Sequence, residues 1–398
     1  MPLIARTIGE SAVKLWGIDA RTRLQRALSL IGMSIDDSND PVIGDQHILL
    51  IHVGYLFEPR TLKSLSERSD CLLRCPATGE FAAAMASEDN YEALSALLLD
   101  PSQTPPSTVE VVEPVNLANF DVALRRAEPP LLLPVSSSNI DALEARLYGN
   151  AYKGITDLVT KWLWPRPAKQ LVRLSTVMSL SPNMVTSLSF VLMLMATWLF
   201  YEGMYWSGLM AGWLMTLLDT VDGKLARVTV QSSRFGHYFD HLIDLFHPPF
   251  WYICWGLSLE DPRLLAFMSV DEAHWLIIYG YIGGRIVEGA FHLFAECSVF
   301  SWRPFDAWFR LITARRNPCL ILLTLSLLIS APEWGLITIT AWTVLTTAVL
   351  VVRLLQAAIG RWVSGKPMQS WLSQPDAETQ HALSFRTFAQ TRGAYAGS

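Results

Sequence analysis

Residues Leu217 to Phe246 read LLDTVDGKLARVTVQSSRFGHYFDHLIDLF, a stretch that places four aspartates beside two apolar segments of membrane-spanning length. In a helical conformation Asp219 and Asp222 are one turn apart and share a face, and Asp240 and Asp244 do the same. A carboxylate in or near hydrocarbon costs about 3 kcal/mol, so four of them require compensation. Divalent cations would supply it, because hard cations prefer oxygen ligands.

The same four acids have a second interpretation. Three basic residues, Lys224, Arg227 and Arg234, lie in the same stretch. Charge alone therefore also allows the acids to be solvated or to form ordinary ion pairs. The composition of the chain and the spacing within the stretch separate the two interpretations.

The composition indicates a membrane protein with a separate polar part. Of the 398 residues, 51% are hydrophobic and 15 are tryptophan, which is high for a soluble protein. Residues 1–150 contain 12 Lys and Arg against 20 Asp and Glu, whereas residues 151–398 contain 19 against 16. The five cysteines have no metal-ligand spacing, and the N-terminus lacks the basic start and apolar core of a signal peptide. We therefore expect an acidic cytosolic domain followed by a basic membrane domain.

The polar part is expected to be a small soluble α/β domain over residues 1–135. The β-branched run Ile48–Val53 predicts a strand, and the residues around Arg60–Leu65 predict a helix after it. Two further helices are predicted around Arg21–Ile31 and Tyr91–Leu99.

Residues 136–180 are predicted to be a linker and a juxtamembrane amphipathic helix, because Lys and Arg interleave with Trp and Leu there. Residues 181–360 are predicted to form an α-helical membrane domain of about six transmembrane helices, and residues 361–398 a cytoplasmic tail. The six spans are about 184–201, 206–226, 238–258, 273–295, 314–331 and 335–357. Basic residues gather after the second, fourth and sixth spans, so the positive-inside rule places both termini in the cytoplasm.

The spacing of the aspartate stretch separates the two interpretations of its acids. It reads Asp219-x2-Asp222-Gly223-x2-Ala226-Arg227-x8-Gly236-x3-Asp240-x3-Asp244. These eight positions resemble the signature of the CDP-alcohol phosphotransferase (CDP-alcohol phosphatidyltransferase) family, and the resemblance extends over about residues 150–360. It implies that a hydroxyl of an acceptor attacks the β-phosphate of a CDP-alcohol and that CMP leaves.

The resemblance also implies what the acids do. Asp219, Asp222 and Asp240 are expected to bind one or two Mg²⁺ or Mn²⁺ ions. Asp244 is expected to be the catalytic base that takes the acceptor proton, and it counts among the metal contacts. Such an arrangement suits hard cations that bridge a pyrophosphate.

Five residues are expected to bind the CDP-alcohol, namely Asn183, Thr186, Gly223, Ala226 and Arg227. The two small residues would let the cytidine diphosphate approach the helix, and Arg227 would contact a phosphate. Asn183 and Thr186 belong to SPNMVT, which fits a helix cap equally well. Gly236 is expected to allow close packing of two helices, with or without a part in the site.

Four polar residues are candidates for binding the acceptor, namely Arg285, Arg315, Arg316 and Asn317. Arg285 lies within a predicted span, where ionisable residues are usually functional, although a structural pair with Glu288 is an alternative. The other three lie at the cytoplasmic end of the fifth span, where a phosphorylated or polyol acceptor would be met. They could equally be charges that set the membrane topology.

The N-terminal domain resembles the nucleotidyltransferase domain that precedes the membrane part in some relatives of the family. The resemblance rests on ILLIHVGYLFEPRTLKSL, Ile48 to Leu65. Gly54 stands where active enzymes carry a metal-binding aspartate, and the chain lacks an N-terminal glycine-rich nucleotide loop. We therefore interpret the domain as degenerate, because the apparatus for cytidylyl transfer is missing.

The leading hypothesis is thus an integral-membrane transferase of phospholipid or phospho-polyol synthesis, with its active site on the cytoplasmic side, in a bacterial inner membrane. Its partners would be a CDP-alcohol donor and a hydroxyl acceptor, at least one of them a lipid, without nucleic acid, and the family implies a homodimer. Two alternatives stay open. One is a non-enzymatic cation-binding or transport protein, and the other is a bifunctional enzyme with an active N-terminal cytidylyltransferase.

Overall fold

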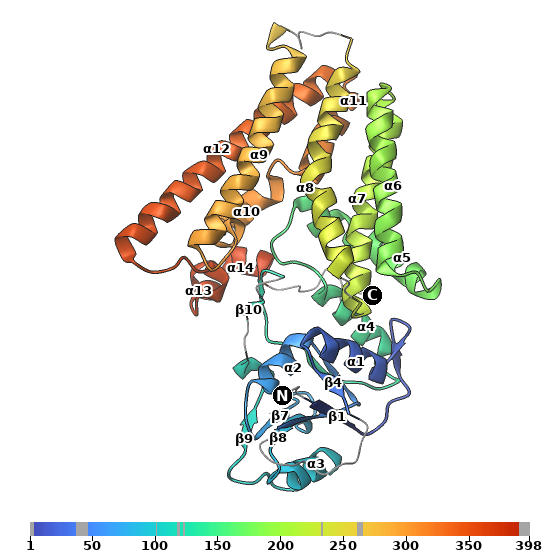
Figure 1. The fold of residues 1–398 in the computed structure, drawn as a ribbon, viewed down its shortest axis with the longest axis vertical. Coiled ribbons are helices and arrows are strands. Elements are labelled where there is room, and N and C mark those ends of the chain that lie inside the picture. Colours follow the sequence, from blue (N-terminus) through green and yellow to red (C-terminus); the bar gives the residue numbers. More distant parts are fainter. Residues whose placement is uncertain are drawn as a thin grey trace.

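The computed structural model describes residues 4–36, 47–100, 102–117, 120–121, 124–231, 234–260 and 266–389. A small α/β body formed by the N-terminal residues lies at one end of the molecule, and a larger helical body forms the other end (Figure 1). The predicted class, a mainly helical chain preceded by a small α/β region, is confirmed.

The N-terminal body is built on a six-stranded mixed sheet of order β4-β1-β5-β8-β7-β9. Its strands are β1 (Ile4–Ile8), β4 (Ser34–Ile35), β5 (Ile48–His52), β7 (Cys71–Arg74), β8 (Phe81–Ala86) and β9 (Glu110–Val112). β1 is parallel to β4 and β5, and β7 is parallel to β9, whereas β8 is antiparallel to both of its neighbours.

Both faces of this sheet are buried. Successive side chains of a strand point to opposite faces, so each face packs against a different set of helices. Leu49 and Ile51 of β5 pack with residues of helices α1 (Ala20–Leu30) and α2 (Pro59–Ser66), whereas Ile48 and Leu50 pack with α3 (Tyr91–Leu99). The predicted strand and all three predicted helices are confirmed to within two residues.

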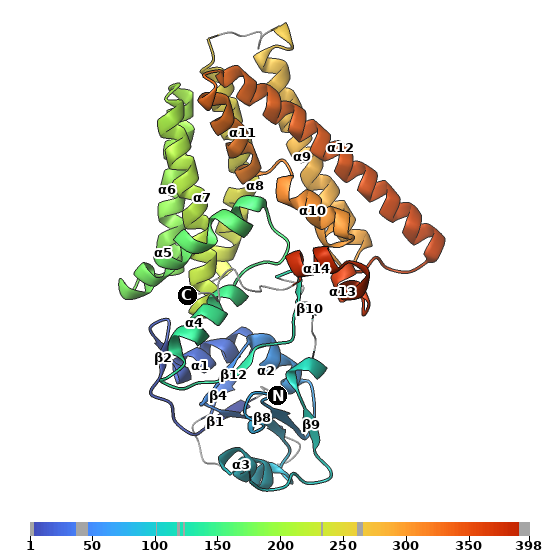
Figure 2. The ribbon, with the colours of Figure 1, turned by 180° about the vertical axis from the view of Figure 1, so that it is seen from behind.

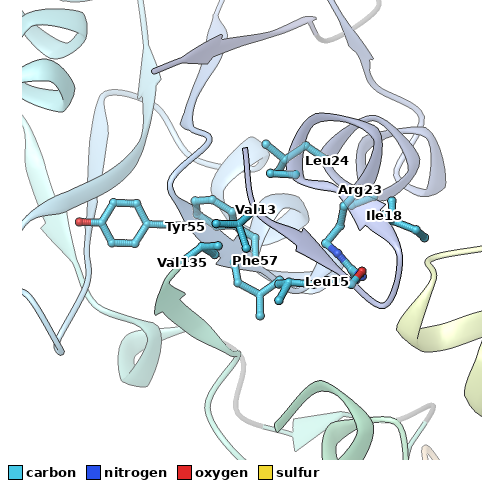
Figure 3. A pocket seen from close by; sticks show the side chains of 11 residues that line it. Val13, Leu15, Ile18, Arg23, Leu24, Tyr55, Phe57 and Val135 are labelled. Carbon is cyan, nitrogen blue, oxygen red and sulfur yellow. The ribbon is translucent and has the colours of Figure 1, made fainter. Parts of the chain in front are cut away.

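The remaining short elements of the body are η1 (Pro114–Asn116) and three two-stranded pairs. The pairs are β2 (Lys14–Leu15) with β3 (Ile18–Asp19), β6 (Tyr55–Phe57) with β12 (Leu132–Pro134), and β10 (Phe120–Asp121) with β11 (Arg126–Ala127). Between α1 and β6 lies a pocket of about 10 Å³ lined by side chains such as Leu15, Leu24 and Phe57 (Figure 3). That volume is about what one water molecule needs, so this pocket cannot hold a nucleotide.

Three helical pieces connect the two bodies, namely α4 (Ile140–Asn150), η2 (Val159–Leu163) and α5 (Pro165–Val177). The predicted basic amphipathic segment is therefore helical but broken. Asp157 begins η2 by accepting hydrogen bonds from the backbone N–H of Val159 and Thr160, at 3.1 and 3.0 Å. The start of α5 is fixed by Pro165, whose backbone suits the first turn of a helix.

The helical body contains a helix at each of the six predicted spans. These helices are α6 (Pro182–Tyr201), α7 (Tyr205–Val228), α8 (Arg234–Leu257), α9 (Val270–Phe294), α11 (Arg316–Leu328) and α12 (Pro332–Ser364), with the short α10 (Pro304–Ile312) before α11. Within the described ranges, α6 and α12 alone are long and apolar enough to cross a membrane, and α10 with α11 make a third candidate if their 45° bend lies inside one span. The chain is an integral membrane protein, and its hydropathy supports two or three of the six predicted spans.

Fewer helices than the six predicted spans are apolar enough to be candidates, because several of the helices carry charge. Asp219, Asp222 and Lys224 lie in α7, and Arg285 and Glu288 lie in α9. Such groups lower the mean hydropathy of a helix whether or not it crosses the bilayer. Length and composition alone therefore do not identify these helices as spans.

Helix α1 fixes the N-terminal body to the end of α7. Arg23 of α1 donates hydrogen bonds to the carbonyl oxygens of Leu15 and Val228, at 3.0 and 2.7 Å, and Arg26 donates to that of Thr229 at 2.8 Å. Cations at the C-terminal end of a helix are favoured by its dipole and satisfy its last carbonyls. Burial lowers the pKa of the Arg23 guanidinium to about 10. The two bodies are thus joined by hydrogen bonds at the mouth of the helical bundle.

Helices α10 and α12 are joined by a buried ion pair. Arg353 donates two hydrogen bonds to the carboxylate of Asp306, at 2.6 and 2.7 Å, and both residues are buried. We expect Arg353→Met to lower the free energy of unfolding by about 3–5 kcal/mol, because it leaves the Asp306 carboxylate buried and uncompensated. Thermal and denaturant unfolding in detergent would measure this loss. The double variant Asp306→Leu, Arg353→Met should recover most of it, and a single-variant loss below about 1 kcal/mol would contradict the pair's role.

The C-terminal segment packs back onto the helical body after α12. It forms η5 (Trp371–Ser373), α13 (Ala377–Gln380) and α14 (Ala382–Phe388), and α14 lies beside α10 (Figure 2). Trp371 and Phe388 are buried in one apolar cluster with Phe300 and Trp302. The predicted tail is therefore folded as far as residue 389, with α12 extending into it.

Lys161 of η2 gives the stability of this junction a pH dependence. Its Nζ donates to the carbonyl of Gly154 at 2.8 Å and lies 5.1 Å from the centre of the Phe388 ring. Burial lowers the pKa of Lys161 from 10.5 to about 8. Between these two pH values the unfolded chain binds more protons than the folded chain, so stability rises with pH. We expect unfolding curves from pH 8 to 10.5 to show this rise, and Lys161→Met to lose it.

Candidate active site

Helix α7 holds the first half of the aspartate motif. Asp219 and Asp222 lie on adjacent turns, and Asp222 is buried with 6% of its surface exposed. The hydroxyl of Thr186, in the first turns of α6, donates to the Asp222 carboxylate at 2.7 Å. Ser181 caps the N-terminus of α6 by accepting from the backbone N–H of Met184 at 3.3 Å. The SPNMVT segment therefore caps α6, as one of its two predicted interpretations requires, and it also brings Thr186 to the Asp222 carboxylate.

A cavity of about 510 Å³ opens at this point, between the helical body and the N-terminal body. Its wall on the helical side contains Asp222 and all five residues predicted to bind the CDP-alcohol, namely Asn183, Thr186, Gly223, Ala226 and Arg227. A Cβ added at Gly223 would have the Arg227 guanidinium, at 3.5 Å, as its nearest neighbour. The glycine and the alanine thus leave this stretch of the helix surface open towards the cavity. The volume lies in the range of pockets that bind small molecules.

The opposite wall of the cavity comes from residues that the sequence did not point to. Arg23, Glu58, Arg60 and Arg126 belong to the N-terminal body, and Asn150 ends α4. Glu58 accepts hydrogen bonds from Arg60 at 2.5 Å, Asn150 at 2.9 Å and Arg126 at 3.2 Å. Each of these residues stands in a sequence context typical of a surface helix or loop, so only the fold brings them together.

Arg227 and Lys224 connect α7 to the segment after α4. The Arg227 guanidinium and the Lys224 ammonium both donate to the carbonyl of Ala151, at 3.1 and 3.0 Å. The Lys224 ammonium also lies 3.5 Å from the centre of the Tyr152 ring, a cation–π contact. Arg227 thus lines the cavity while one of its nitrogens is held in place by backbone.

The four predicted acceptor residues do not form a single group. Arg316 forms an ion pair with Asp219. Arg285 and Arg315 both pair with Glu288, each at 2.5 Å. Asn317 is buried and donates to Asp157 at 2.9 Å.

The electrostatics of this region follow from those partners. Although burial opposes ionisation of Asp157, the charge of Arg310 and the hydrogen bonds from Thr160 and Asn317 lower the pKa of its carboxyl. Arg125, in the loop before β11, is half-buried near Arg315, and desolvation together with that like charge lowers the pKa of its guanidinium. Arg125, Arg310 and Arg315 thus lie near the carboxylates of Asp157 and Glu288.

The second half of the motif belongs to α8. Gly236, Asp240 and Asp244 lie in its first half, and their side chains are outside the described part of the structure. Among the side chains that are described, no group of three or more His, Cys, Asp or Glu is arranged to hold a metal ion. The predicted ligand set contributes only Asp219 and Asp222 to that search. All four predicted ligands are carboxylates, the donor type that Mg²⁺ and Mn²⁺ prefer.

The end of strand β5 has no room for a carboxylate at Gly54. A Cβ built on Gly54 would lie 2.8 and 2.9 Å from two atoms of the His52 ring, and the Gly54 N–H donates to His52 Nδ1 at 3.1 Å. Burial lowers the pKa of His52, which favours the neutral imidazole that this hydrogen bond requires. A side chain at position 54 would therefore require the His52 ring to move.

Comparison with known proteins agrees with the motif. Residues 179–283 match the family model of the CDP-alcohol phosphatidyltransferases. A CDP-diacylglycerol–serine O-phosphatidyltransferase from Helicobacter pylori is 36% identical over 110 residues, which are 27% of this chain and 37% of that protein. The chain thus matches a little over a third of the length of this curated relative. The predicted family resemblance is confirmed over the segment that contains α6, α7, α8 and the first half of α9.

Proposed function

We propose that this chain, which carries a CDP-alcohol phosphatidyltransferase domain at residues 179–283, transfers a phospho-alcohol group from a CDP-alcohol to a hydroxyl acceptor in phospholipid synthesis. The acceptor oxygen forms a bond to the β-phosphorus of the donor. The phosphoanhydride bond to CMP breaks, and CMP leaves with the bridging oxygen. The proposed catalytic base, Asp244, receives the proton of the acceptor hydroxyl.

The observation that supports this proposal most strongly is the 510 Å³ cavity beside Asp222. It is lined by residues of α6 and α7 that are widely separated in sequence but belong to one proposed donor site. Arg227 offers a bidentate cation to a phosphate group, and the small Gly223 and Ala226 let that phosphate come near the α7 backbone. Thr186 orients the Asp222 carboxylate through their 2.7 Å hydrogen bond.

The aspartates are proposed to hold the cofactor. Asp219, Asp222, Asp240 and Asp244 would bind Mg²⁺ or Mn²⁺, because a set of carboxylates near a low-dielectric region requires compensating charge. When bound, a divalent cation supplies charge neutralisation at the diphosphate and at the departing oxygen. The guanidinium of Arg316 forms an ion pair with Asp219, so it lies beside the proposed cation ligands.

Lipid is the proposed donor class, with CDP-diacylglycerol as the first candidate. Large exposed apolar side chains follow α6 at helical spacing, namely Met184, Leu188, Val191 and Met195, and this stripe begins directly after Asn183 of the cavity wall. Acyl chains could lie along it in the bilayer while the diphosphate enters the cavity. The Helicobacter pylori relative is named for the same donor. The acceptor is proposed to be a small polar alcohol, with serine as one candidate.

We further propose six membrane-spanning helices with both termini and the cavity on the cytoplasmic side of a bacterial inner membrane. Basic residues of the loops and the charged mouth formed by α7, α9 and α11 support this orientation. A homodimer is proposed from the family resemblance alone. Cysteine labelling of loop positions from each side of the membrane and chemical crosslinking would test these two points.

The proposal predicts CMP release by the purified full-length chain. With CDP-diacylglycerol and an alcohol acceptor, CMP should form with Mg²⁺ or Mn²⁺, stop with EDTA and resume when the cation is restored. Serine, glycerol phosphate, inositol phosphate and inositol would be compared as acceptors, and CDP-inositol as an alternative donor. CMP formation measured by chromatography decides the result.

Other outcomes of the same assay distinguish the alternatives. If the folded protein released no CMP with any donor and acceptor, the proposed transferase activity would be contradicted. Cation uptake by vesicles containing the chain would then favour transport. Consumption of CTP with pyrophosphate release would instead indicate an active N-terminal cytidylyltransferase.

A further inference from the structure

The two walls of the cavity differ in origin and in chemistry. The wall from α6 and α7 contains the motif residues Asp222 and Arg227, which suit a diphosphate and its cation. The wall from the N-terminal body and α4 contains Glu58, Arg126 and Asn150. A donor that places its diphosphate against the first wall therefore presents another part of itself to the second.

We propose that Glu58, Arg126 and Asn150 bind the cytosine base of the donor, so that the N-terminal domain acts as the nucleotide-recognition wall of the transferase site. This inference rests on the proposed function, since it assumes that a cytidine nucleotide occupies the cavity. It assigns to the domain a binding role in the membrane reaction instead of a second reaction of its own.

The three residues form one buried, preorganised cluster. Arg126 is 1% exposed and Asn150 is 7% exposed. Glu58 accepts from both, at 3.2 Å from Arg126 Nη2 and at 2.9 Å from Asn150 Nδ2. The second hydrogen bond fixes the orientation of the Asn150 amide, so its Oδ1 is the atom left for another partner.

The cluster retains buried polar atoms of both kinds. Nε and Nη1 of Arg126, which are donors, and Oδ1 of Asn150, which is an acceptor, make no hydrogen bond within the described residues. Nη1 of Arg126 forms an ion pair with Glu128 at 3.7 Å, which is longer than a hydrogen bond. A buried polar atom without a partner costs about 1–3 kcal/mol, so a ligand that satisfies these atoms would gain affinity.

A cytosine edge matches that combination better than a phosphate does. Cytosine presents an amino group that donates next to a ring nitrogen and a carbonyl oxygen that accept. The amino group would donate to Asn150 Oδ1 or Glu58, and the accepting atoms would receive from Arg126. A phosphate only accepts, so it would leave the Asn150 oxygen and the Glu58 carboxylate facing negative charge.

The same assignment accounts for a domain that has lost its own reactive position. The family resemblance places the carboxylate of an active nucleotidyltransferase at Gly54, where an added Cβ would lie within 2.9 Å of the His52 ring. The body is nevertheless fixed to the membrane part through Arg23, which contacts the end of α7 and lines the cavity. A domain held in this position would keep a binding function after the loss of catalysis.

The test measures nucleotide binding by the full-length chain in detergent with Mg²⁺. Dissociation constants for CMP, UMP and inorganic pyrophosphate would be determined by titration calorimetry for the wild type, Asn150→Ala and Arg126→Lys. UMP replaces the amino group of cytosine by an oxygen and its accepting ring nitrogen by N–H. Arg68→Ala, which removes an exposed ion pair with Glu110 elsewhere on the domain, is the matched control.

We expect the wild type to bind CMP at least about tenfold more tightly than UMP, which corresponds to one lost hydrogen bond. Asn150→Ala and Arg126→Lys should each weaken CMP binding about tenfold and reduce the preference over UMP, with pyrophosphate binding unchanged. The Arg68→Ala control should bind all three as the wild type does. The conservative Arg126→Lys keeps the charge, so its folding can be checked by thermal unfolding while the planar hydrogen-bond pattern is lost.

Four results would overturn the inference, and the last would also overturn the proposed function. If both variants bind CMP as tightly as the wild type, the cluster does not contact the base. If they lose pyrophosphate binding as strongly as CMP binding, the wall binds phosphate instead. If the wild type binds CMP and UMP equally, the base is not recognised. A wild type that binds no CMP and releases none would overturn the proposed function itself, and this inference with it.

Discussion

Asp222→Asn is expected to reduce CMP release by about a thousandfold, the upper end of what the loss of one group that stabilises the transition state costs. Asparagine has nearly the same shape and keeps one oxygen that can accept from Thr186, whose hydroxyl lies 2.7 Å from the carboxylate. The variant should therefore fold and insert, while the negative charge proposed to hold a cation is gone. Initial rates of CMP formation over a range of Mg²⁺ concentrations would measure the loss.

The control for this variant is Asp141→Asn, because Asp141 lies on α4 with 97% of its side chain exposed. It should keep wild-type activity. If Asp222→Asn retains more than about a tenth of the wild-type rate at every Mg²⁺ concentration, the carboxylate has no essential role. An unfolding temperature that falls together with the activity would mean that Asp222 is mainly structural.

Gly154→Val is expected to disrupt the packing between the N-terminal body and the C-terminal segment. A Cβ at position 154 would lie 2.1 Å from the carbonyl oxygen of Phe388 and 2.6 Å from that of Arg125. Both neighbours are backbone atoms, so the C-terminal helix α14, the loop before β11 or the connector itself must move. Overpacking of this kind costs about 1–3 kcal/mol or more. The unfolding temperature and the rate of limited proteolysis between the two bodies would report the change.

The Gly154→Val variant should also bind CMP less tightly, because Arg126 of β11 follows Arg125 directly and lines the cavity. We expect weaker CMP binding and faster cleavage around residues 124–154. Gly289→Ala is the matched control, since an added Cβ at Gly289 of α9 has no neighbour within 4 Å. If Gly154→Val unfolds and is cleaved as the control does, the packing described at Gly154 is wrong.

The sequence allowed much of the helical body to be predicted. Apolar runs and their flanking charges located a helix at every predicted span, because hydropathy over about 20 residues is a local property. The spacing of Asp219 and Asp222 gave their common helix face for the same reason. Which helices are apolar enough to cross a bilayer was less predictable, because α7 and α9 carry charges whose partners lie elsewhere in the chain.

The far wall of the cavity could not be predicted. Glu58, Arg126 and Asn150 are separated by up to 92 positions, and each stands at a helix end or in a short strand without a motif. Their meeting depends on tertiary packing, which periodicity does not encode. The partner of Asn317 could not be predicted either, because its amide donates to Asp157 of the connector, 160 residues away. Such long-range polar partners determine which side chains line the site, and a local sequence pattern does not reveal them.

A structure of the full-length chain with a cytidine diphosphate alcohol and Mn²⁺ would locate both the nucleotide and the cation. We expect nucleotide density in the cavity between α7 and the N-terminal body, with an anomalous Mn²⁺ signal beside Asp219 and Asp222 and the base against Asn150. A nucleotide bound elsewhere, or a cation site away from these aspartates, would contradict this expectation.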